Sequence, residues 1–139
     1  MFALDIEDGW PPVGSEGVWC ERVDKNYRMK NSPFSIPGIA FNDIFAAEID
    51  SVNEHIFGFE IIKESGHSVV WLMNNNDLDI SEFRKKIIDL GCSFEGFPKF
   101  SLGSIDIPHT VDGESFERLV DEYEEKGIDF AFPVWRHGA

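Results

Sequence analysis

The chain has 139 residues, enough for one ordinary hydrophobic core or for two small modules that share one. Its hydrophobic content of 42% and aromatic content of 14% are typical of a folded protein and argue against disorder. The formal net charge of −14 disfavours binding to nucleic acid or to anionic membranes, because both need clustered Lys and Arg. Acidity also keeps proteins soluble, so the total charge alone does not identify a function.

The N-terminal segment and the cysteines indicate the compartment. Residues 1–17 contain acidic but no basic residues and no long apolar run, so they do not form a signal peptide. No segment approaches the roughly 18 consecutive apolar residues of a membrane helix. Cys20 and Cys92 each lie in an apolar strand-like run, and we predict two buried free thiols rather than a disulfide. These features predict a cytoplasmic protein.

The first half of the chain is predicted to contain strands. Residues 1–17 show no sustained period and are predicted to form an irregular N-terminal arm. Residues 18–64 hold short alternating runs separated by turn residues, which predicts a small antiparallel β module that is either a strongly bent sheet or a half-barrel. Its predicted strands are residues 18–23, 26–30, 43–49 and 55–63. A helix is the alternative for residues 41–49.

Residues 65–139 show a different pattern, in which apolar runs alternate with helical periods. The nearly continuous apolar run 68–73 is typical of a strand that is buried on both faces. The order strand, helix, strand, strand, helix, strand predicts a ferredoxin-like βαββαβ sandwich. The predicted strands are residues 68–73, 92–97, 100–107 and 128–134. The fold class is therefore α+β, with the small β module packed on the sandwich as one compact unit.

Each predicted helix has a start signal, an apolar stripe and a stop signal. In the helix over residues 80–90, Asp79 and Glu82 have capping-box spacing, and Gly91 is a C-terminal stop. In the second helix, Asp112 or Thr110 is the cap and Gly127 ends the helix. The two stripes consist of Ile80, Phe83, Ile87 and Leu90, and of Phe116, Leu119, Val120 and Tyr123.

Three short stretches carry a resemblance to a known family: Asn31-Ser32-Pro33-Phe34, Gly38-Ile39-Ala40 with Asp43 following, and Ser65-Gly66-His67-Ser68. With them the chain resembles a family of small bacterial proteins of unknown function, in which Asn-x-Pro-Phe, Gly-Val/Ile-x-x-x-Asp and Gly-His-Ser stretches occur in this order. The resemblance covers residues 18–134, implies the two-part architecture and supplies no activity. By length, acidity and cytosolic character the chain also looks like immunity proteins of contact-dependent growth inhibition systems.

His67 and Ser68 are the first candidate site. Adjacent residues on a strand point to opposite faces, so His67 is not placed to act as a base for Ser68, and we find no Asp that would orient its imidazole. Their side chains are better explained by hydrogen bonds to neighbouring backbone. The four histidines are scattered and no loop has Ca²⁺-binding spacing, so we expect neither a metal nor another cofactor.

The second predicted helix is the more informative element. Its outward face is rich in carboxylates, although like charges at i, i+3 and i+4 weaken a helix. A solvated face explains this pattern as well as a docking surface does. The docking interpretation assigns attraction of a basic partner to Glu114, Glu117, Asp121, Glu122, Glu125 and Asp129.

From these observations we expect a binding protein and not an enzyme. The specific hypothesis is an acidic cytoplasmic immunity protein that neutralises a cognate bacterial toxin domain, expected to be a nuclease, by blocking its basic active site. The alternative is a regulatory domain with a small-molecule pocket between the two modules near His67 and Ser68. Hydrolysis that uses His67 is the third and least supported hypothesis.

Overall fold

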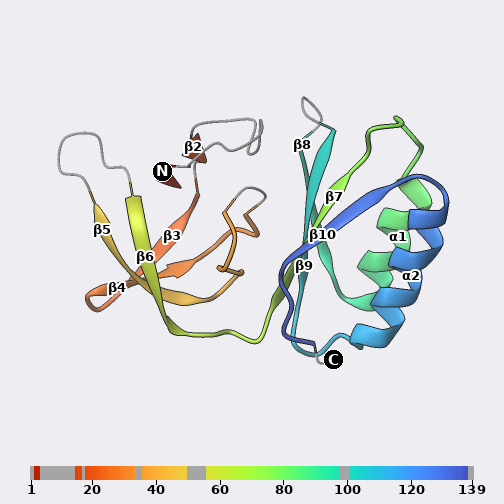
Figure 1. The fold of residues 1–139 in the computed structure, drawn as a ribbon. Helices are drawn as coiled ribbons and strands as arrows, with labels where there is room; N and C mark the ends of the chain where they lie inside the picture. Colours follow the sequence, from red (N-terminus) through yellow and green to blue (C-terminus); the bar gives the residue numbers. More distant parts are fainter. Residues whose placement is uncertain are drawn as a thin grey trace. The chain divides into compact units, whose positions relative to one another are not determined.

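The structure is a computed structural model, in which residues 2–3, 15–16, 18–33, 36–49, 56–97 and 101–137 are described. The chain forms two compact units, Met1–Ser65 and Gly66–Ala139. Their described residues form two β-sheets and two helices, so the protein is a mixed α+β protein (Figure 1). Neither helix among the described residues is long and apolar enough to cross a membrane.

The first unit contains one six-stranded sheet with the order β2-β1-β6-β5-β4-β3. Its strands are β1 (Phe2–Ala3), β2 (Ser15–Glu16), β3 (Cys20–Val23), β4 (Asn26–Met29), β5 (Ile44–Ile49) and β6 (Ile56–Lys63). Neighbouring strands run antiparallel, except β1 and β6, which pair in parallel at a single position. The predicted strands of this half are confirmed, and the helix considered for residues 41–49 is wrong. The sequence did not predict β1 and β2, because a two-residue strand shows no period.

Phe45 forms the centre of the core of this unit. It is fully buried on β5, and its ring centroid lies 5.8 Å from that of Tyr27 and 6.1 Å from that of Phe59. Met29, Ile36 and Ile39 complete the buried cluster. Two apolar residues of the loop between β4 and β5 thus belong to the core, which fixes the path of that loop.

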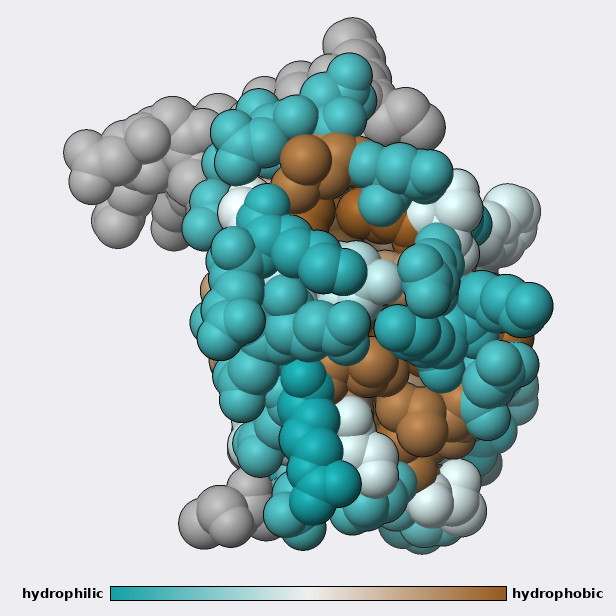
Figure 2. Space-filling view, turned by 90° about the vertical axis from the view of Figure 1, so that its right-hand side faces the viewer, coloured by the Kyte–Doolittle hydropathy of each residue, from teal (hydrophilic) through white to brown (hydrophobic). Residues whose placement is uncertain are grey.

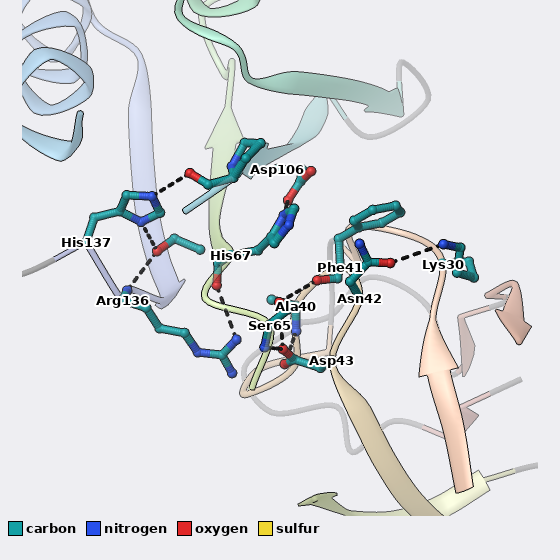
Figure 3. Close-up of polar contacts among 12 residues, drawn as sticks. Lys30, Ala40, Phe41, Asn42, Asp43, Ser65, His67, Asp106, Arg136 and His137 are labelled. Carbon is teal, nitrogen blue, oxygen red and sulfur yellow. Dashed lines mark hydrogen bonds and ion pairs between the residues drawn. The ribbon is translucent and has the colours of Figure 1, made fainter. Parts of the chain in front are cut away.

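A buried carboxylate holds the loop in place. Asp43 is fully buried, and its Oδ2 accepts the backbone N–H of Ala40 at 2.8 Å. Its Oδ1 accepts both the backbone N–H and the hydroxyl of Ser65, at 2.9 and 3.0 Å (Figure 3). Asn42 has a φ of +67°, which closes the tight turn in which the N–H of Asp43 donates to the carbonyl of Ala40. The side chain of Asp43 therefore joins two of the three stretches that carry the family resemblance, its own stretch and the one that begins at Ser65.

The second unit contains a four-stranded sheet with the order β10-β7-β9-β8, in which all neighbours are antiparallel. Its strands are β7 (Ser68–Met73), β8 (Ser93–Phe97), β9 (Leu102–Ile107) and β10 (Asp129–Val134). Helices α1 (Ser81–Leu90) and α2 (Gly113–Glu125) lie on the same face of the sheet (Figure 1). α1 packs against β8, and α2 packs against β10.

The predicted helix stripes form the core between the helices and this sheet. Phe83 and Ile87 on α1 and Phe116, Val120 and Tyr123 on α2 are buried. Ile80, Leu90 and Leu119 are partly buried against the same cluster. The rings of Phe83 and Tyr123 join the two helices edge to face at a centroid distance of 4.8 Å.

The helix ends agree with the sequence in most respects. Gly91 and Gly127 follow the two helices with φ values of +107° and +105°, as their stop signals predict. Asp112 is the N-cap residue of α2. The predicted capping box of α1 is wrong, because Ile80 occupies the N-cap position. Asp79 lies one residue earlier, and its Oδ1 instead accepts the N–H and hydroxyl of Ser81.

Substitution of Asp43 tests the role of the buried carboxylate in the first unit. Asp43→Asn keeps the shape but replaces one of the two acceptor oxygens with an NH2 group, which cannot accept a hydrogen bond from an N–H. We expect a loss of about 2–4 kcal/mol in the free energy of unfolding by urea titration. The control, Glu60→Gln at an exposed position of β6, changes this free energy by less than about 0.5 kcal/mol. Equal stability of the Asp43→Asn variant and the control contradicts this role.

Candidate functional site

The carboxylates of α2 fall into two groups, and the first group is already paired. The carboxylate of Glu114 lies 3.1 Å from the guanidinium of Arg118. Glu122 lies 3.7 Å from the ammonium of Lys126 and 3.8 Å from that of Lys86, which projects from α1. Lys86 also lies 3.5 Å from Glu82, so a chain of ion pairs joins the two helices. These partners reduce the charge that Glu114 and Glu122 offer to another protein.

The second group consists of Glu117, Asp121, Glu124 and Glu125. Their spacing of i, i+4, i+7 and i+8 places them along one face of the helix, and all four are exposed. Within the described ranges, no basic side chain lies within 4.0 Å of these carboxylates. Asp129, at the start of β10, is exposed and accepts a hydrogen bond from the amide of Asn75 at 3.3 Å.

An exposed aromatic side chain lies on β10, the strand on which α2 packs. Phe132 is 43% exposed, and its ring contacts that of Trp135 at a centroid distance of 5.4 Å. The ring of Trp135 lies 6.1 Å from that of Phe116, the residue before Glu117 on α2. A series of rings therefore connects Phe132 to α2 next to the unpaired carboxylates. We call Glu117, Asp121, Glu124, Glu125 and Phe132 together the α2–β10 edge.

The backbone of β10 is poorly suited to pair with another strand. β10 is an edge strand, its register is irregular between Ala131 and Val134, and it contains Pro133. Proline and bulges on edge strands block the addition of a further strand. Contacts at the α2–β10 edge therefore depend on side chains. The helix-bearing face of the second unit is mostly hydrophilic, with apolar groups exposed between the polar ones (Figure 2).

His67 has a carboxylate partner that the sequence analysis missed. Its Nδ1 lies 2.7 Å from Oδ1 of Asp106, and both side chains are almost buried (Figure 3). The pair forms because β7 and β9 are adjacent, with Val69 opposite Asp106. Burial raises the pKa of Asp106, although its hydrogen bond with His67 opposes the shift. No local signal joins two residues that are 39 positions apart.

Ser68 interacts with a different histidine. Its fully buried hydroxyl lies 2.6 Å from Nδ1 of His137 and accepts the backbone N–H of Arg136 at 2.7 Å. Nε2 of His137 lies 2.8 Å from the carbonyl oxygen of Pro108, so Nε2 donates and Nδ1 accepts the proton of Ser68. The network ties the C-terminal residues to β7 and β9. The buried hydroxyl of Ser68 is thus engaged by His137 and Arg136.

The cysteines and the metal-binding residue types add no further site. Cys20 and Cys92 are both free, but only Cys92 is buried, so the prediction of a buried Cys20 is wrong. Burial and the negative charge of Asp106 raise the pKa of the Cys92 thiol to about 12. Among the residues that the structure describes, no three His, Cys, Asp or Glu side chains are grouped to hold a metal ion.

Comparison with known proteins places the chain in a family. A family model described as "Domain of unknown function (DUF4265)" matches residues 16–130. The chain belongs to this family. Membership of the DUF4265 family agrees with the predicted resemblance to proteins of unknown function. The growth-inhibition likeness stays a prediction.

One solved structure supports the fold of this DUF4265 protein. It is titled "Novel crystal structure of a hypothetical protein from Neisseria gonorrhoeae" and matches with a TM-score of 0.69 at 20% sequence identity. The match covers 80% of this chain and 76% of the other. At this identity the similarity shows the fold alone. No curated protein matches the chain.

Substitution of Asp106 tests the electrostatics of the buried pair. The raised pKa means that the folded state binds the Asp106 proton more tightly than the unfolded chain does. Above the ordinary Asp pKa of about 3.9, this residue therefore lowers stability as the pH rises towards the folded-state pKa. Asp106→Asn removes this pH dependence, so we expect the variant to gain stability relative to the parent protein as the pH rises from about 4 through the raised folded-state pKa of Asp106.

Urea titrations at several pH values measure this difference. Asp89→Asn, at an exposed position on α1, is the matched control and should give a profile parallel to that of the parent protein. If the stability of Asp106→Asn also changed with pH in parallel with that of the parent protein, protonation of Asp106 would not be coupled to folding.

Proposed function

We propose that this DUF4265 protein is a binding protein and not an enzyme, and that its α2–β10 edge docks a basic protein partner. The observation that carries the proposal is the row of four exposed carboxylates on α2 that have no basic partner among the described residues. An exposed phenylalanine on β10, the strand against which α2 packs, accompanies them. The specific proposal is an immunity protein that acts in the cytoplasm and neutralises a cognate bacterial toxin domain.

A nuclease is the toxin that this chemistry fits best. An enzyme that binds a nucleic-acid backbone lines its active site with Lys and Arg, because these residues neutralise phosphates. Carboxylates along one face of a helix present negative charge at regular intervals, as phosphates do. With the net charge of −14, they attract a basic cleft and accelerate association. A partner bound over such a cleft excludes the substrate.

The charges and the aromatic side chain have different roles in this proposal. Exposed charges at an interface rim mainly affect the association rate and its salt dependence. Most of the affinity at protein interfaces comes from a few desolvated anchors, which are often aromatic. Phe132 is the candidate anchor, because it is exposed and its ring packs edge to face against that of Trp135. Glu114, Glu122 and Asp129 contribute less than the sequence indicated, since each already has a partner.

We also infer that the second unit is a ferredoxin-like sandwich. The supporting observations are the chain order β7-α1-β8-β9-α2-β10, the antiparallel strand order β10-β7-β9-β8 and the helices on one face. In such an arrangement α2 covers an outer strand, so its flank away from α1 faces solvent. This position leaves the α2–β10 edge accessible to a partner.

Charge reversal tests the docking surface. The partner is the protein encoded by the gene adjacent to this one, since immunity proteins are encoded beside their toxins. Reversing Glu117, Asp121 and Glu125 to Lys should slow its association about 10- to 100-fold at low salt, and high salt should reduce the difference. Stopped-flow fluorescence measures this rate.

The matched control reverses Glu48, Glu60 and Glu95 to Lys. These three carboxylates are also exposed, and the change in net charge is the same. Their reversal should slow association less than about threefold. If both triple variants slow association equally, total charge rather than the α2–β10 edge attracts the partner, and the assigned surface is wrong.

Substitution of the anchor tests affinity separately. Phe132→Ala should weaken binding by about 2 kcal/mol or more, mainly through faster dissociation. Ile88→Ala is the control, because Ile88 is 55% exposed on α1 and lies outside the α2–β10 edge. Dissociation rates from biolayer interferometry compare the two variants, and equal rates would exclude Phe132 as the anchor.

A further inference from the structure

A small open hollow lies in the second unit, between the end of β7, the first turn of α1 and the strands β8 and β9. Its volume is about 210 Å³, which is below the range of roughly 300–1,000 Å³ for pockets that bind drug-sized ligands. Its apolar lining comes from Leu72, Ile80, Phe94 and Leu102, with Gly96 beside them. Asn74, Asp77, Arg84 and Ser101 contribute the polar groups.

Glycines allow an aromatic ring to form one wall of the hollow. Gly96 and Gly103 lie opposite each other on β8 and β9, and the ring of Phe94 lies against both. A Cβ on Gly103 would lie only 2.4 Å from Cζ of Phe94, so a side chain there would displace the ring. The guanidinium of Arg84 lies over the same ring at 4.5 Å from its centroid. The ring thus holds the cation at the hollow.

Arg84 is available to a ligand. Within the described part of the chain, no carboxylate lies within 4.0 Å of its guanidinium, although the protein is strongly acidic. A guanidinium that stacks on a ring keeps its in-plane N–H groups for a second partner. A carboxylate matches this planar donor set with two parallel hydrogen bonds.

Asp77 provides the opposite charge in the same hollow. It lies in the loop after β7 with a φ of +51°, and no cation is within 4.0 Å of its carboxylate among the described residues. A monoanion would be attracted by Arg84 but repelled by Asp77. A monocation would be attracted by Asp77 but repelled by Arg84. A zwitterion with an apolar body satisfies both charges and the apolar lining.

The neighbouring hollow between the start of α1 and the end of α2 does not offer a pair of unpaired opposite charges. Its volume is about 350 Å³, and its charged lining residues are Asp79, Glu82 and Lys126. Asp79 accepts two hydrogen bonds from Ser81, Glu82 pairs with Lys86, and Lys126 pairs with Glu122. Its charges are therefore already satisfied within the protein.

We propose that the hollow at Arg84 binds a free α-amino acid with an apolar side chain. The guanidinium of Arg84 binds the carboxylate of the ligand, and the carboxylate of Asp77 binds its ammonium group. The side chain lies against Phe94, Leu72 and Ile80. The proposal goes beyond the docking function and does not depend on it, because none of these residues belongs to the α2–β10 edge.

Three probes with similar branched apolar bodies test the assignment of charges. They are L-leucine, 4-methylpentanoate, which lacks the ammonium group, and 3-methylbutylamine, which lacks the carboxylate. We expect saturable shifts of backbone amide signals around the hollow in ¹⁵N–¹H NMR spectra of the full chain with leucine. Each analogue should bind about 10- to 100-fold more weakly than leucine, since each loses one charge-assisted interaction. Equal binding of leucine and either analogue overturns the zwitterion assignment, and no saturable shift with leucine overturns the site.

Substitutions assign the two charges to their residues. Arg84→Gln should weaken leucine binding to about that of 3-methylbutylamine, and Asp77→Asn should weaken it to about that of 4-methylpentanoate. Lys85→Gln is the matched control, because Lys85 is an exposed cation next to Arg84 on α1 and does not line the hollow. Unchanged leucine affinity in Arg84→Gln, or an equal loss in Lys85→Gln, contradicts the proposal.

Discussion

The ion pairs between α1 and α2 determine which charges of the second unit remain for other molecules. Lys86 of α1 joins Glu82 on its own helix to Glu122 on α2, and Lys126 approaches Glu122 from the other side. Both lysines also lie over the ring of Tyr123, which is buried between the helices. The flank of α2 that faces α1 is therefore largely neutralised. On the opposite flank, Glu117, Asp121, Glu124 and Glu125 have no basic side chain within 4.0 Å among the described residues, and Arg84 on α1 likewise has no carboxylate within that distance.

This division of charge was only partly predictable from the sequence. The helix stripes and the apolar run of β7 define the buried faces, because burial repeats with the period of the element. They also identify the outward carboxylates of α2. Spacing along one helix cannot show that Lys86 of another helix reaches Glu122. The exposure of Phe132 was likewise hidden, because it depends on the edge position and irregular register of β10.

The polar contacts of His67 and Ser68 also could not be predicted from sequence patterns. Both residues were identified in the sequence, but their partners, Asp106 and His137, lie 39 and 69 positions away. Strand pairing brings Asp106 to His67, and the C-terminal residues bring His137 to Ser68. Local patterns contain no information on such pairs. In this protein the two pairs join β7 to β9 and to the C-terminal residues.

A direct measurement of the docking surface is amide hydrogen exchange of the chain, alone and bound to the protein encoded by the adjacent gene. If the partner docks at the α2–β10 edge, binding slows exchange in α2 and β10, at residues 113–125 and 129–134, and leaves exchange in β3–β6 of the first unit unchanged. Protection confined to β3–β6, with none in α2 or β10, would contradict the claim that unpaired carboxylates of the second unit bind the partner.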